Sequence, residues 1–156
     1  MKINLKHFKV KLIVFCISFT SFASAEEPLE VIMKAYRSVP NVETGAIEEV
    51  EADEAIPGDI IIYRATFTNK SKKPFSSLSP QIPIPGSLVY VKDSAKPLPV
   101  KVLLRDEQGI QAFPPVDTTT QELIQPEQYG AILWELDSLA PGESFEAELQ
   151  AKVLKD

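Results

Sequence analysis

Two stretches of the chain alternate strictly between apolar and polar residues, and each follows a Pro-Gly turn. After Pro57-Gly58, the apolar or aromatic positions on one side are Ile61, Tyr63, Ala65 and Phe67. After Pro141-Gly142, they are Phe145, Ala147, Leu149, Ala151 and Val153. A period of two that begins at a turn is typical of a half-buried β-strand. The pattern therefore predicts two long strands that bracket an all-β fold.

Weaker patterns predict further strands at 29–36, 75–82, 88–92, 100–105, 110–113 and 131–136. The turn residues Asp106-Glu107-Gln108-Gly109 predict that strands 100–105 and 110–113 form a hairpin. The first of these could be an edge strand, and Pro80 should make the second an edge or bulged strand. The acidic stretch 43–55 favours a short irregular strand, although the spacing of Ile47 and Val50 also allows a helical turn. Seven or eight strands at this spacing predict two packed antiparallel sheets.

Residues 1–25 have the features of a cleavable secretory signal peptide. A lysine-rich start is followed by a short apolar stretch, 12–22, and then by the small-residue cleavage pattern Ala23-Ser24-Ala25. The stretch is too short to cross a bilayer. The alternatives are an uncleaved anchor and a lipoprotein. Phe15 stands where lipid attachment to Cys16 would need a small residue, which disfavours the second. We expect a bacterial periplasmic or secreted protein with no membrane insertion after cleavage.

Removal of the leader would leave an N-terminal strand and linker at 26–45 and one β-sandwich domain at 46–156. It would also change the charge. All 22 acidic residues but only 12 of the 16 basic residues follow residue 25, so the net charge becomes about −10. Such a surface repels nucleic acid, which we exclude as a partner.

The exported part would contain no histidine and no cysteine, since His7 and Cys16 both lie in the leader. Disulfides, thiol nucleophiles, Ser-His pairs and the usual zinc or copper sites are then excluded. Carboxylates, lysines and hydroxyls remain, without a Ser-x-x-Lys context. We therefore expect no enzyme and no cofactor, and we assign no catalytic, cofactor-binding or metal-binding residue.

Two aromatic residues have expected structural roles. Trp134, the only tryptophan, should lie in the core between the sheets, with an exposed ligand-stacking role as the alternative. Tyr129 should donate a hydrogen bond to backbone at a sheet corner, because buried tyrosine hydroxyls usually find a partner.

Three separated blocks of sequence resemble a known family. The first runs from Ile56-Pro57-Gly58-Asp59 to Asn69, the second from Ile84-Pro85-Gly86 to Val91, and the third from Trp134 to Ser144. Together they resemble the bacterial conserved-repeat family, the eleventh domain of unknown function, over about residues 50–154. The resemblance implies an immunoglobulin-like sandwich of envelope and surface proteins, often in tandem arrays. The family brings no known catalytic residues.

Two clusters are candidates for partner binding. Phe113, Leu123 and Ile124 border the proline-rich segment 114–128, and long loops in compact sandwiches tend to be functional. These three side chains could instead close the open end of the sandwich. Lys70, Lys72 and Lys73 form a basic cluster on an acidic background, which could dock an anionic partner or be a solvated hairpin tip.

The sequence thus predicts a non-catalytic module that acts through contacts with an unknown protein of the bacterial cell envelope or surface. One alternative is a subunit or chaperone of a surface assembly, with 29–36 as a strand exchanged between chains. The other is calcium-dependent adhesion through the acidic run 48–54, although that run lacks the spacing of a calcium loop. The identity of the partner and the oligomeric state do not follow from the sequence.

Overall fold

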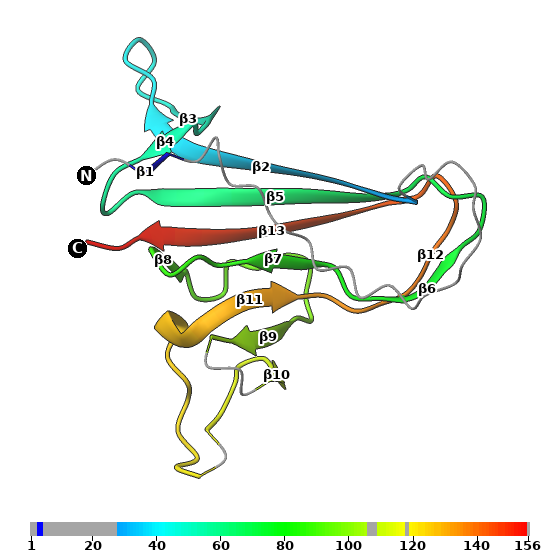
Figure 1. The fold of residues 1–156 in the computed structure, drawn as a ribbon. Coiled ribbons are helices and arrows are strands. Elements are labelled where there is room, and N and C mark those ends of the chain that lie inside the picture. The colour runs from blue at the N-terminus through cyan, green and yellow to red at the C-terminus, as the bar shows by residue number, and fades with distance from the viewer. Residues whose placement is uncertain (1–2, 5–27, 106–108, 118, 156) are drawn as a thin grey trace.

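The computed structural model describes residues 3–4, 28–105, 109–117 and 119–155 (Figure 1). These residues form antiparallel β-strands and one turn of 3₁₀-helix, and none of them lies in an α-helix. The elements are β1 Ile3–Asn4, β2 Leu29–Pro40, β3 Ile47–Glu51, β4 Glu54–Ala55, β5 Ile60–Asn69, β6 Phe75–Leu78, β7 Gln81–Pro83, β8 Leu88–Tyr90, β9 Lys101–Leu104, β10 Ile110–Ala112, η1 Pro126–Gln128, β11 Tyr129–Leu133, β12 Leu136–Leu139 and β13 Ser144–Val153.

The larger sheet has the strand order β3-β2-β5-β13-β8, so the two strands predicted with most weight, β5 and β13, are neighbours at its centre. They pair from Ser144 opposite Thr68 to Lys152 opposite Ile60. The alternation is confirmed, because the predicted inward side chains of β5 and those of β13 from Ala147 onward are all buried. β4 pairs with β1, which falls within the predicted leader. Residues 5–27, and with them most of the leader, lie outside the described residues.

The second sheet has the order β10-β9-β11-β7 and lies below the first in Figure 1. The predicted hairpin is confirmed in its strands, since β9 and β10 pair antiparallel, although its tip at 106–108 lies outside the described residues. The predicted strand 75–82 is interrupted at Pro80 and forms the two strands β6 and β7. The Pro80 carbonyl oxygen accepts a hydrogen bond from the backbone N–H of Trp134 at 2.9 Å. β6 pairs with β12, and this pair extends away from both larger sheets (Figure 1).

One hydrophobic cluster receives side chains from both larger sheets. Trp134 is 2% exposed, which confirms its predicted place in the core. Its indole Nε1–H donates to the Pro97 carbonyl oxygen at 2.7 Å, and its ring packs edge-on against Phe145. The Tyr129 hydroxyl donates to the Ile124 carbonyl oxygen at 3.3 Å, so the predicted backbone hydrogen bond is also confirmed. The core therefore fixes the relative position of the two sheets.

Asn69, at the end of β5, joins two turns. Its side chain is fully buried, and its amide nitrogen donates to the carbonyl oxygens of Lys73 and Leu139, both at 2.8 Å. Its amide oxygen accepts from the backbone N–H and the hydroxyl of Ser71 at 2.9 and 2.7 Å. The turn after β5 and the turn before β13 are thus held together by one side chain.

The alternation of the first strand covers 29–36, and Pro40-Asn41 is the signal expected to end it. β2 runs to Pro40, in agreement with that signal, and β3 pairs with it from Tyr36 onward. The predicted edge position therefore holds only for the N-terminal half of β2. The acidic stretch forms the short strands β3 and β4, as favoured over a helical turn.

Candidate functional site

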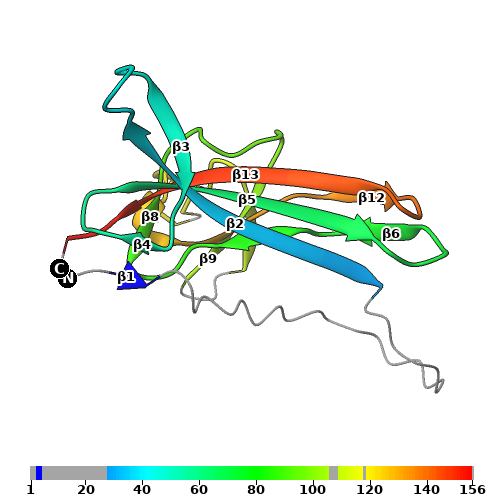
Figure 2. The ribbon, with the colours of Figure 1, turned by 90° about the horizontal axis from the view of Figure 1, so that it is seen from above.

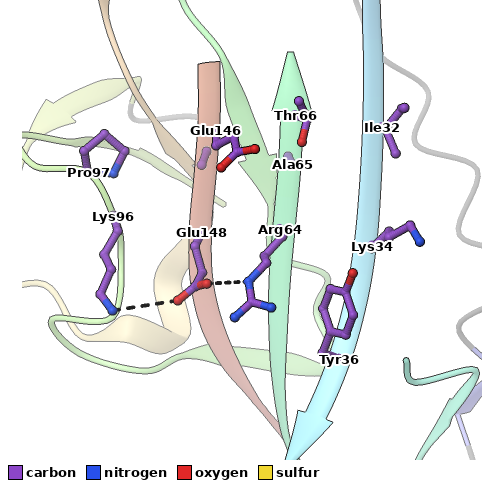
Figure 3. A pocket seen from close by; sticks show the side chains of 11 residues that line it. Ile32, Lys34, Tyr36, Arg64, Ala65, Thr66, Lys96, Pro97, Glu146 and Glu148 are labelled. Atoms are coloured by element: carbon purple, nitrogen blue, oxygen red, sulfur yellow. Dashed lines mark hydrogen bonds and ion pairs between the residues drawn. The ribbon is translucent and has the colours of Figure 1, made fainter. Parts of the chain in front are cut away.

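A groove of about 630 Å³ lies on the outer face of the five-stranded sheet, the face turned away from the core (Figure 3). It crosses β2, β5 and β13 and reaches the segment that follows β8. The residues that line it are Ile32, Lys34, Tyr36, Arg64, Ala65, Thr66, Lys96, Pro97, Glu146, Ala147 and Glu148. Successive side chains of a strand point to opposite faces, so the polar half of each alternating pattern supplies this surface.

The pairing register aligns these side chains in rows across the sheet. Lys34, Arg64 and Glu148 lie opposite one another in one row. Ile32, Thr66 and Glu146 form the next row. Side chains directly opposite across neighbouring strands are close enough to interact. The charged row therefore lies beside a row that is apolar at one end and acidic at the other.

Arg64 is the electrostatic centre of the groove. Its Nε donates to Glu148 Oε2 at 2.6 Å, its Nη1 donates to Glu49 Oε2 at 2.7 Å, and its guanidinium carbon lies 5.0 Å from the ring centroid of Tyr36. The hydrogen bonds to Glu49 and Glu148 raise the pKa of the guanidinium above its usual value. Because Glu49 belongs to β3, this contact also ties the β2–β3 hairpin to the centre of the sheet.

The other wall of the groove is formed by Lys96 and Pro97. The backbone of Lys96 exchanges hydrogen bonds with Glu148 at 2.8 and 2.9 Å, and its Nζ lies 3.9 Å from Glu148 Oε1 (Figure 3). Pro97 is fixed from beneath by its hydrogen bond to Trp134. Backbone pairing and a buried tryptophan thus hold this wall, so the groove is preformed.

The side chains of the groove can pack, donate and accept hydrogen bonds. Its hydroxyls come from Tyr36 and Thr66, and the single histidine of the chain, His7, is in the predicted leader. Arg64 and Glu148 already satisfy each other. This arrangement offers shape and fixed charge to a ligand.

The two predicted binding clusters lie elsewhere and apart from each other. The lysines are in the turn between β5 and β6, where Lys70 Nζ lies 3.1 Å from Glu30 Oε2 and Lys72 and Lys73 are exposed. In Figure 1 this turn lies at the right-hand end of the long strands, whereas residues 113–117 and 119–124 lie below the four-stranded sheet, far from it. Neither cluster contributes to the groove.

The apolar cluster is largely committed to the core. Ile124 is buried, and Phe113 packs edge-on against the rings of Tyr90 and Tyr129. Leu123 is 55% exposed and is the member of this cluster open to a partner. Its role in binding stays a prediction.

The acidic run pairs with basic or amide side chains. Glu49 contacts Arg64, Glu51 contacts Lys34 at 3.6 Å, and Glu48 accepts from Asn41 Nδ2 at 2.6 Å. Within the described ranges, no three His, Cys, Asp or Glu side chains form a group that could hold a metal ion. No specific contact thus favours the calcium alternative.

Comparison with family models, with curated proteins and with solved structures found no match to this chain. The resemblance to the conserved-repeat family therefore stays a prediction. None of the described segments forms a helix with the length and apolar character that a membrane span requires.

The groove was not identified from the sequence. The outward positions of β5 and β13 were predicted correctly, but the register that brings Glu49, Arg64 and Glu148 together links segments far apart in the chain. One local signal was present. Ile32 is an apolar residue at an outward position of β2, where the alternation calls for a polar side chain.

Proposed function

We propose that the chain is an exported, non-catalytic β-sandwich module of the bacterial cell envelope that binds a partner protein through the groove on β2, β5 and β13. This proposal rests on the side chains of the two rows that line the groove. An exposed apolar residue, Ile32, and the ring of Tyr36 lie beside a fixed guanidinium and two carboxylates. Aromatic and arginine side chains with an apolar neighbour are the typical composition of protein-binding surfaces.

The immunoglobulin-like assignment is part of the same proposal. Two antiparallel sheets share one core, and the order β2-β5-β13-β8 corresponds to strands A-B-E-D of an immunoglobulin sandwich. One difference concerns chain order. Here β9, β10 and β11 precede β13, whereas in immunoglobulin domains strands F and G follow strand E. The proposal is therefore an immunoglobulin-like sandwich with altered connectivity.

A steric block in the groove tests the function. Thr66 is half-buried on β5 in the middle of the groove, and Thr68 lies two residues further along the same strand and face, outside the groove. Thr66→Lys should fill the groove, whereas Thr68→Lys is the matched control. We expect affinity capture from envelope extracts to recover one partner with the wild type and Thr68→Lys but not with Thr66→Lys. Recovery of no partner, or equal recovery with Thr66→Lys, would refute the proposal.

A further inference from the structure

The N-terminal half of β2 has an edge that no described strand covers. β5 pairs with one edge of β2 from Leu29 to Arg37, but β3 pairs with the other edge only from Tyr36 to Pro40. Within the described part of the chain, residues 29–34 therefore present unpaired backbone groups along one side. Figure 2 shows β3 beside the C-terminal end of β2, with the rest of β2 at the rim of the sheet.

The hydrogen bonds at the two ends of this segment show which backbone groups point outward. The Ala35 carbonyl oxygen accepts from the Ala52 N–H at 2.8 Å on the β3 side. The Pro28 carbonyl oxygen accepts from the Lys70 N–H at 2.9 Å on the β5 side. Because these directions alternate along a strand, Leu29, Val31 and Met33 direct their N–H and C=O groups toward the open edge.

This edge lacks most of the features that usually prevent pairing. Natural edge strands are protected by proline, bulges, shortness, inward-pointing charges or charged side chains such as lysine, and only the last kind is present here. Residues 29–35 contain no proline, their pairing with β5 has no bulge, and their two charges, Glu30 and Lys34, are on the outer face. Ile32 is 50% exposed on that face. The inner-face side chains are only half-buried, since β2 lies far from the four-stranded sheet in Figure 1.

We infer that a second copy of this chain adds to the edge, with its β2 antiparallel to the first and Ile32 opposite Ile32 of the second copy. In this register Glu30 lies opposite Lys34 of the second copy, and the symmetric pair repeats the contact. Val31 and Met33 then form hydrogen-bonded pairs, and Ile32 forms a non-hydrogen-bonded pair, whose side chains lie closest together. The N–H and C=O groups of Val31 and Met33, which point toward the open edge, are therefore the groups that this register hydrogen-bonds.

The neighbouring symmetric registers fit less well. A register centred on Val31 places Glu30 opposite Ile32, and one centred on Met33 places Ile32 opposite Lys34. Each of these registers puts a charged side chain opposite an apolar one. The register centred on Ile32 instead puts opposite charges across from each other, which is stabilising. In the register centred on Ile32, Leu29 lies opposite Ala35, whose carbonyl oxygen already accepts from Ala52, so the new pairing ends where the pairing with the β3 side begins. This self-complementarity identifies a second copy as the occupant.

The existing ion pairs of Glu30 and Lys34 are compatible with this arrangement. Glu30 lies 3.1 Å from Lys70 Nζ and Lys34 lies 3.6 Å from Glu51, and all four side chains are about half exposed. Exposed pairs of this kind hold their partners weakly, so the carboxylate and the ammonium can each add a contact across the interface. The inference does not depend on the proposed function of the groove.

Charge reversal tests the register. Sedimentation of the purified full-chain protein should give twice the mass of one chain, and Glu30→Lys or Lys34→Glu alone should weaken self-association about tenfold, since both symmetric pairs become repulsive. An equimolar mixture of the two variants should recover the wild-type affinity as a mixed dimer. Lys152→Glu, on the outer face of β13 and outside the groove, is the matched control and should associate like the wild type.

Cross-linking gives a second measurement that does not depend on the charge variants. Cα atoms of a non-hydrogen-bonded pair are about 4.5 Å apart, within the range for a disulfide. In a Cys16→Ser background, Ile32→Cys should form a covalent dimer on oxidation, whereas Glu30→Cys should not link to itself. A monomeric wild type at all concentrations would overturn the inference. So would failure of the mixed variants to pair, or equal cross-linking of both cysteine variants.

Discussion

Replacing Asn69 by alanine should destabilise the protein more than any other polar-to-alanine change at the end of β5. The Asn69 side chain is fully buried and makes four hydrogen bonds to the turns on either side of it. Alanine removes them all. The Leu139 carbonyl oxygen, whose hydrogen bond to Asn69 is buried, then loses this donor at a place that water reaches poorly.

The magnitude follows from these contacts. A net contribution of about 1 kcal/mol for each of the two bonds donated by the amide nitrogen, and about 1 kcal/mol for the acceptor side, gives a loss of about 3 kcal/mol. That is a large fraction of the stability of a domain of this size. Asn69→Asp should cost at least as much near pH 7, because a carboxylate cannot donate to the Lys73 and Leu139 carbonyl oxygens.

Urea unfolding monitored by the fluorescence of Trp134 measures this loss, since the only tryptophan is buried in the core. Ser71→Ala is the matched control. It removes only one of the four hydrogen-bond partners of the Asn69 side chain and leaves the other three, so it should cost about 1 kcal/mol at most. An Asn69→Ala protein that unfolds within about 0.5 kcal/mol of the wild type, with an unchanged slope, would refute the assignment of Asn69 as the link between the two turns.

Two further predictions concern Tyr63 and Arg64. Burial raises the pKa of Tyr63 from 10.0 to about 12, and its hydroxyl has no hydrogen-bond partner among the described residues. The folded state therefore resists ionisation, and the wild type should lose about 2 kcal/mol relative to Tyr63→Phe as the pH rises from about 10 to 12. Parallel stability curves for the two proteins over this range would contradict it. For the half-exposed Arg64–Glu49 pair, a double-mutant cycle with Arg64→Met and Glu49→Gln should give a coupling of only about 0.2–1 kcal/mol. Hydrogen exchange in β3 should nevertheless accelerate in either variant, and unchanged exchange would show that the pair does not hold the hairpin.

The sequence was sufficient for features that depend on local periodicity. The alternation on β5 and β13 predicted their inward side chains, because a strand that buries one face must place apolar residues at every second position. The burial of Trp134 and the backbone hydrogen bond of Tyr129 could be predicted, because large aromatic residues tend to be buried with their polar atoms paired. The hairpin strands β9 and β10 followed from a turn signal between two short apolar runs.

Features that depend on register could not be predicted in the same way. Glu49 belongs to an acidic run that is solvated by default, and only the pairing of β2 with both β3 and β5 brings it to Arg64. The unpaired edge of β2 has the same origin, because alternation identifies a strand but not which of its two edges is covered. Register is set by the packing of whole strands against one another, which periodicity within one strand does not contain.

The groove and the open edge share strand β2, and this links the two proposals physically. Ile32 and Lys34 line the groove and also lie at the centre of the inferred dimer, so a change at either residue affects both surfaces. Thr66 belongs to the groove alone, whereas Glu30 belongs to the edge alone. Thr66→Lys should therefore abolish partner capture and leave the mass of the dimer unchanged, and Glu30→Lys should weaken the dimer before it affects the groove. If Glu30→Lys removed partner capture together with the dimer, partner binding would require the two grooves brought side by side by the paired β2 strands.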